Sequence, residues 1–275
     1  MPRVTALNLF PVKSCRGLAV TSAAVDGRGF IGDRRFLVVD ADGRFLTQRA
    51  HPRMALIETA LTAGDLILAS SGHGSVRVPL QPTTQIPQLK TVAIWRDTVT
   101  ADDCGDEPAG WLSRMLGLPC RLVRAGAAYA RPVAAHKLPA TLPGTPAPTH
   151  EVSFADAFPF MLLSEASLAD LNARLATPLP MNRFRPSLVV SGTEAYAEDA
   201  WGRFRIGEVV FHGATRCGRC VVTTTDQLTA ERAAEPLRTL ATYRRDAGGD
   251  VMFGRNLVHE TKTGRLAVGD EVEFL

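Results

Sequence analysis

The chain has 275 residues, of which 45% are hydrophobic and 21% charged, with a formal net charge of +3. This is the composition of an ordinary folded protein, and a small charge without runs of Lys or Arg argues against nucleic-acid binding. No apolar run approaches the roughly 20 residues that span a bilayer, no secretory signal begins the chain, and an odd number of cysteines favours a reducing compartment. We therefore expect a cytoplasmic protein without a membrane segment.

The first half of the chain predicts short antiparallel strands joined by tight turns. Turn signals such as Asp26-Gly27 and Asp42-Gly43 separate stretches rich in Val, Leu and Phe. A helix near residues 107–116 follows, because its apolar residues recur at helical spacing. The expected strands cover residues 4–10, 20–25, 36–40, 45–48, 55–59, 66–69, 75–80 and 91–94.

The second half begins after a stretch of Ala, Pro and Thr at residues 131–149, which is typical of a linker or long loop. Ser164 is the expected N-cap of a helix that Pro178 ends, and a short helix is expected at 235–243. Strands are expected at 188–191, 203–206, 208–213, 257–258 and 271–275.

Few helices and many short strands favour barrels over a doubly wound parallel sheet. We therefore predict a mainly β chain of the α+β class, in two β-barrel-like units at 1–124 and 125–275. The functional site is expected in the cleft between them.

The motif Cys217-Gly-Arg-Cys220 is the sharpest chemical feature. Two thiols beside arginines lie in an electropositive turn, which favours a thiolate, and a thiolate is a metal ligand or a nucleophile. Four other interpretations stay open at this point: half of a structural zinc site, a Cys2His zinc site with His212, a thioredoxin-like redox pair, or simple burial. The redox pair needs a helix after the motif, whereas the Thr-rich run at 221–226 predicts a strand.

Several cations occur in segments that could hold an anion. Lys13 and Ser14 lie in a loop after the first strand, where charge and backbone N–H groups could bind an oxyanion. Arg34 follows an aspartate, and Arg183 and Arg185 alternate before a strand, so that one of them would face the interior. The alternatives are a plain turn with a solvated lysine and ordinary surface salt bridges.

Taken together and in order, these segments resemble the MOSC family, in particular the mitochondrial amidoxime-reducing components and bacterial YcbX-like proteins. The resemblance covers nearly the whole chain and pairs an N-terminal β-barrel domain with a MOSC domain. Each segment alone is unspecific, and their order and spacing are specific. The matching segments are residues 10–14, 33–34, 47–49, 162–168, 184–186, 217–226, 253–254 and 268–270.

The resemblance implies a molybdenum bound to a pterin, with Cys220 as the metal ligand and catalytic residue and Cys217 beside it. A soft thiolate suits a transition metal, and converging arginines suit a pterin phosphate. The family's cofactor contacts fall on Lys13, Ser14, Arg34, Ser164, Arg185, Arg219 and Asn256.

The same resemblance implies an oxidoreductase that reduces small N-hydroxylated compounds such as amidoximes and hydroxylamines. No cysteine run typical of an iron–sulfur domain follows Cys220, so a separate electron-donor protein is expected. The main alternative is a carrier of molybdenum cofactor or sulfur without reductase turnover. Two further alternatives are a pyridoxal-phosphate protein using Lys13, one of four lysines, and a zinc hydrolase with His212.

Overall fold

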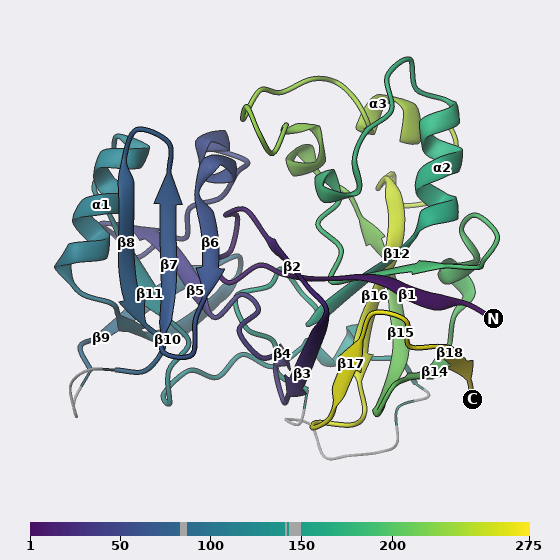
Figure 1. Ribbon diagram of the computed structural model, residues 1–275, viewed down its shortest axis with the longest axis horizontal. Helices are drawn as coiled ribbons and strands as arrows, with labels where there is room; N and C mark the ends of the chain where they lie inside the picture. Colours follow the sequence, from purple (N-terminus) through teal and green to yellow (C-terminus); the bar gives the residue numbers. More distant parts are fainter. Residues whose placement is uncertain (83–86, 141, 143–149) are drawn as a thin grey trace.

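The computed structural model describes residues 1–82, 87–140, 142 and 150–275 (Figure 1). The chain is mostly β with three α-helices in the described residues, which confirms the predicted fold class. Its described strands form four sheets, none of them a closed barrel. The helices are α1 (Asp106–Leu116), α2 (Glu165–Ala173) and α3 (Leu237–Leu240), and the 3-10 helices are η1 (Pro52–Leu56), η2 (Ala135–Lys137), η3 (Met181–Arg183), η4 (Ala197–Ala200) and η5 (Val221–Thr224).

The largest sheet has eight strands and mixes the two ends of the chain. Figure 1 shows the first strand, in purple, among the green and yellow strands of the C-terminal half. The strands are, in spatial order, β18 (Val272–Phe274), β14 (Arg203–Ile206), β15 (Val209–Gly218), β16 (Met252–His259), β12 (Phe160–Ser164), β13 (Leu188–Ser191), β1 (Arg3–Leu9) and β2 (Leu18–Val20).

The other three sheets are smaller. One of them again joins distant parts of the chain, because β17 pairs with β3. The boundary near residue 125 therefore stays a prediction about sequence units, since strands from both sides of it share sheets. One sheet has four strands, in the order β5 (Phe36–Asp40), β11 (Cys120–Arg124), β10 (Asp97–Asp103) and β9 (Leu89–Ile94). The second has three strands, in the order β17 (Arg265–Ala267), β3 (Ser22–Asp26) and β4 (Gly29–Phe30). The third also has three strands, in the order β6 (Glu58–Leu61), β7 (Asp65–Ser70) and β8 (Gly74–Pro79).

Three local predictions were wrong. Residues 45–48 form no strand, because the carbonyl of Thr47 accepts the N–H of His51 at 2.8 Å and turns the chain. Residues 55–56 belong to η1, which Pro52 begins, and only 58–61 are extended. Residues 221–224 form η5 rather than a strand, because the carbonyl of Cys220 accepts the N–H of Thr223 at 3.0 Å.

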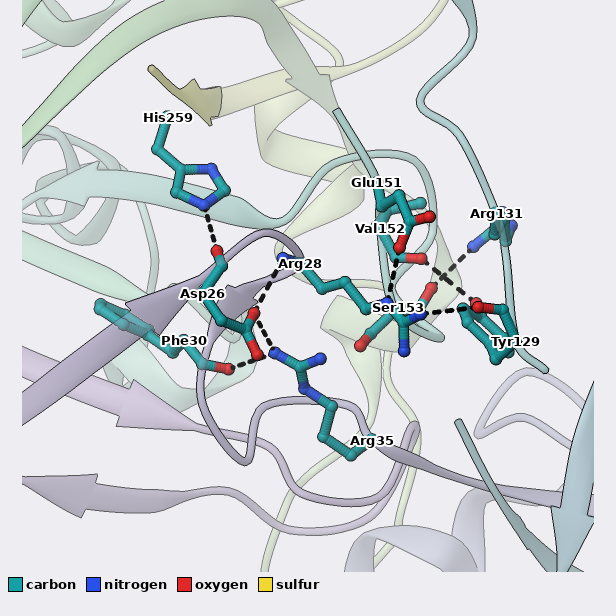
Figure 2. Close-up of polar contacts among 10 residues, drawn as sticks. All are labelled: Asp26, Arg28, Phe30, Arg35, Tyr129, Arg131, Glu151, Val152, Ser153 and His259. Atoms are coloured by element: carbon teal, nitrogen blue, oxygen red, sulfur yellow. Dashed lines mark hydrogen bonds and ion pairs between the residues drawn. The ribbon is translucent and has the colours of Figure 1, made fainter. Parts of the chain in front are cut away.

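A polar network ties the N-terminal strands to the second half of the chain (Figure 2). Arg28 donates to the carboxylate of Glu151 at 2.7 Å and to the carbonyl of Tyr129 at 2.6 Å. The buried ring of His259 contacts the carbonyl of Asp26 at 2.6 Å. Because buried polar groups are costly to leave unpaired, these contacts fix how the β3–β4 hairpin packs against β16 and the segment before β12.

The main apolar core lies against the eight-stranded sheet. The ring of Phe160 on β12 packs edge-on against Phe30 at 4.9 Å and against Phe211 at 5.2 Å between centroids. Among the helices of the described residues, none is long and apolar enough to cross a membrane.

Candidate functional site

A cleft of about 150 Å³ lies where the loop after β1, the segment before β12, the loop before β13 and the turn after β15 meet. It brings together eight of the nine site residues predicted from the sequence, although they come from distant segments. The eight are Lys13, Ser14, Arg34, Arg185, Cys217, Arg219, Cys220 and Asn256.

The backbone around the cleft is strained. Ser14, Arg34, Trp95 and Arg185 line it, and their φ angles are +67°, +49°, +56° and +55°. Side chains other than glycine rarely adopt this left-handed region, and such conformations concentrate at functional sites. Only two other non-glycine residues in the described part of the chain have positive φ. The strain is therefore concentrated at this cleft.

The charge of the cleft is strongly positive. Five cations line it, namely Lys13, Arg34, Arg49, Arg185 and Arg219, against the single carboxylate of Asp156. Such a surface attracts an anion, and several arginines together suit a phosphate.

Lys13 is the most enclosed of these cations. Its ammonium is paired with Asp156 and lies 5.7 Å from the centroid of the Trp95 ring. Burial lowers the pKa of Lys13, and the ion pair with Asp156 opposes that shift. Burial would raise the pKa of Asp156, but Lys13 outweighs it and holds that pKa below its usual range. The pair thus places a buried lysine and its partner carboxylate together at the edge of the cleft.

Arg34 and Arg185 flank one aromatic ring. Their guanidinium carbons lie 4.9 and 4.2 Å from the centroid of Phe10. Arg34 donates to Asp33 at 2.5 Å, and Arg185 donates to the carbonyl of Cys15 at 2.8 Å. Burial and the nearby Arg34 lower the pKa of Arg185 to about 10, which still leaves Arg185 charged at neutral pH. Two close, partly buried cations favour an anionic ligand between or beside them.

The turn after β15 presents the two thiols. Arg219 donates to the Cys217 sulfur at 3.0 Å and to the carbonyl of Phe184 at 2.6 Å. The Nε of Arg219 is buried and has no hydrogen-bond partner in the structure. Cys220 precedes η5 and is partly exposed to the cleft. Arg219 thus contacts the first thiol of the motif, while the second stays accessible.

Ser164 is the one predicted site residue outside the cleft. It is fully buried and caps α2, where its hydroxyl accepts the N–H of Ser167 at 3.0 Å. Its own N–H donates to Glu198 at 3.1 Å. The predicted cap is therefore present, whereas the predicted contact with a cofactor has no support in this geometry.

Among the lining residues that were not predicted as site residues, Arg49, Trp95 and Asp156 bear most on the charge of the cleft. Arg49 lies in the segment 47–49, one of those that carry the resemblance to the MOSC family. Its guanidinium carbon lies 4.5 Å from the centroid of the Trp95 ring. Asp156 lies in no motif that we recognised in the sequence. Its backbone carbonyl accepts from the buried Arg131 at 2.9 Å, which positions the segment before β12.

The described residues offer no set of ligands for the Cys2His zinc site considered as an alternative. In the described part of the chain, no three His, Cys, Asp or Glu side chains lie close enough to hold a metal ion. His212, its proposed third ligand, is buried beside Glu260, with 2.9 Å between Nε2 and Oε2.

Comparison with known proteins agrees with the fold. Residues 1–119 match the model of the MOSC N-terminal beta barrel domain, and residues 149–273 match that of the MOSC domain. The chain therefore belongs to the MOSC-domain family, which confirms the resemblance found in the sequence.

Two relatives stand out among named proteins. The chain is 34% identical to human mitochondrial amidoxime-reducing component 1 over 99% of this chain and 82% of that protein. It is 35% identical to the molybdenum cofactor sulfurase of Danio rerio over 98% of this chain, which spans about a third (34%) of the sulfurase. Among solved structures, the YUAD protein of Bacillus subtilis aligns over 99% of this chain with a TM-score of 0.43 and 12% identity.

Proposed function

We propose that this protein binds a molybdenum–pterin cofactor in the cleft and reduces small N-hydroxylated compounds. The observation that carries the proposal is the combination of an accessible thiol at Cys220 with five lining cations. The length-wide similarity to an amidoxime-reducing component supports the reaction class, because 82% of that protein aligns. A cytoplasmic location remains a prediction.

The donor set of the cleft fits such a cofactor. Cysteine sulfur is a soft ligand suited to a transition metal, and the sulfur of Cys220 is free of Arg219, which contacts Cys217. The buried, unpaired Nε of Arg219 is a donor that lacks an acceptor, and a phosphate or pterin oxygen would satisfy it. Lys13, Ser14, Arg34, Arg185 and Asn256 are the residues we assign to the remaining cofactor contacts.

The cofactor, when bound, supplies two-electron removal of oxygen from the substrate. The protein's residues bind and orient. The positive-φ residues hold Arg34 and Arg185 beside the cleft, and the ion pairs with Asp33 and Asp156 fix the positions of Arg34 and Lys13. A separate electron-donor protein and a small N-hydroxylated substrate are part of the proposal.

A second candidate is a cofactor or sulfur carrier without turnover. The similarity to the cofactor sulfurase, at 35% identity over 98% of this chain, favours this carrier function. In this case Cys217 or Cys220 would carry a persulfide, and supplied electrons would not reduce an amidoxime.

The test is metal and pterin analysis of protein made in cells that produce molybdenum cofactor. We expect near-stoichiometric molybdenum in the native chain and its loss in Cys220→Ala. The matched control is Cys104→Ala, whose thiol lies outside the cleft. Amidoxime reduction with an artificial donor then separates the two candidates. Native protein without molybdenum, or Cys220→Ala that retains it, contradicts the assignment of Cys220.

A further inference from the structure

A second cavity lies behind the wall of the cleft. Its volume is about 610 Å³, within the range of roughly 300–1,000 Å³ that small-molecule sites occupy. Arg185 lines both this cavity and the cleft, and Phe10, which stacks on Arg185, faces the cavity. The two spaces therefore share Arg185 as part of a common wall, and their other lining residues differ.

The walls of the cavity follow from the periodicity of two elements. Ala6, Asn8 and Phe10 alternate along and just beyond β1 and so face one side of the sheet. Across from them, α2 contributes Glu165, Leu168, Ala169 and Asn172, a spacing of three and four that places them on one helix face. The opposite side of α2 buries Leu171 in the core.

Much of the lining is apolar, but two arginines interrupt it. Leu168, Met181 and Val189 provide the apolar surface. Arg16 donates to the backbone carbonyl of Gln227 at 3.0 Å, and Arg185 donates to the side-chain oxygen of Gln227 at 3.5 Å. Gln227 therefore brings the two cations to the same part of the cavity.

Arg16 has unused hydrogen-bonding capacity. The Nε of Arg16 is buried and has no partner in the structure, although its Nη1 pairs with Glu58 at 2.7 Å. A buried donor without an acceptor costs free energy, which an anionic oxygen would recover. Glu165 is the one carboxylate in this lining, and it is exposed at the first turn of α2, where the helix dipole favours it.

We propose that this cavity binds a small amphipathic carboxylate, with its apolar body against α2 and β13 and its carboxylate toward Arg16 and Arg185. The apolar lining suits a hydrocarbon chain or ring, and the paired arginines suit the carboxylate. This site goes beyond the proposed cofactor function. It shares Arg185 with the cleft, whereas Arg16 and the apolar lining belong to the cavity alone.

The test is calorimetric titration of the purified full chain with octanoate and, separately, with octanamide. We expect octanoate to bind at one site and octanamide to bind about tenfold more weakly, as loss of a charge-assisted hydrogen bond implies. Ala169→Phe, at an exposed position of α2, should fill the cavity and weaken octanoate at least about tenfold. Ala173→Phe is the matched control, because it is exposed on the same helix and does not line the cavity.

Arg16→Gln addresses the anion directly. It should weaken octanoate about tenfold and leave octanamide unchanged, and thermal unfolding of every variant checks that it folds. No octanoate binding to the native chain, or binding that survives Ala169→Phe, overturns the site. Equal binding of octanoate and octanamide, unaffected by Arg16→Gln, overturns the assignment of the carboxylate. Since the titration needs no molybdenum, either result leaves the cofactor proposal intact.

Discussion

Mild acid should destabilise this fold through one buried histidine. His259 is 1% exposed, and its ring contacts the Asp26 carbonyl at 2.6 Å (Figure 2). The ring also packs edge-on against Phe160, with 5.0 Å between the centroids. Burial first, and then the nearby Lys262, lower the pKa of His259 from 6.5 to about 4. The folded chain thus keeps the ring neutral at a pH at which the unfolded chain protonates it.

The sign and size of the effect follow from that pKa. Because it is lower in the folded state, the stability is fully present above about pH 6.5 and is lost as the pH falls toward about 4. The whole difference corresponds to about 3 kcal/mol of unfolding free energy, of which about 2 kcal/mol is lost between pH 7.5 and 5.0.

Urea unfolding at pH 7.5 and 5.0 measures this loss. His259→Gln removes the titrating ring, so the variant should lose about 2 kcal/mol less than the native chain over the same interval. His136→Gln is the matched control, since His136 is exposed and should leave the native loss unchanged. His150, whose pKa is also lowered to about 4, contributes equally to both proteins. Equal losses in native protein and His259→Gln would refute the reasoning.

Three further predictions concern stability near the site. In thermal unfolding, Gly254→Ala should lower the unfolding free energy by about 2 kcal/mol more than Gly249→Ala does. Both glycines have φ near +90°, but only at Gly254 would an added Cβ lie 2.8 Å from the Met161 side chain. Ser164→Ala should lose about 1 kcal/mol of stability with no loss of bound molybdenum; a fall in metal content would instead restore its role as a cofactor contact. Asp33→Asn should lower the unfolding free energy by about 3 kcal/mol in urea unfolding, because it breaks a buried ion pair with Arg34. Asp65→Asn breaks an exposed ion pair with Arg77 and should lower it by less than about 1 kcal/mol. Similar losses in the two variants would contradict the difference in burial.

Local sequence signals located α1, which has one exposed face, but missed β10 and β17. The helix expected at 107–116 is α1, because its apolar residues recur at helical spacing and Gly117 ends it in the left-handed conformation. β12 went unrecognised although it lies inside the largest sheet. All five of its residues are buried, so it shows no alternation, and a short continuous apolar run does not distinguish a strand from a buried helix.

The site was predictable in its residues and not in its shape. The order of the motifs identified eight residues that line the cleft. Their convergence depends on left-handed backbone at Ser14, Arg34 and Arg185, which is uncommon for these residue types and which tertiary contacts must impose. Asp156 was missed because its position depends on the distant Arg131 rather than on neighbouring residues.

Without a ligand, the arrangement of the cleft costs the folded protein free energy. This cost connects the shape of the cleft with its proposed use. Cations gathered around one carboxylate repel one another, strained backbone adds to the cost, and the Nε of Arg219 lacks an acceptor. An anionic ligand would offset the repulsion among the cations and would stabilise the folded state by its binding free energy. The arrangement is therefore better explained by selection for anion binding than by selection for stability. The same reasoning, from buried arginine nitrogens without acceptors, supports Arg16 as the anion contact of the second cavity.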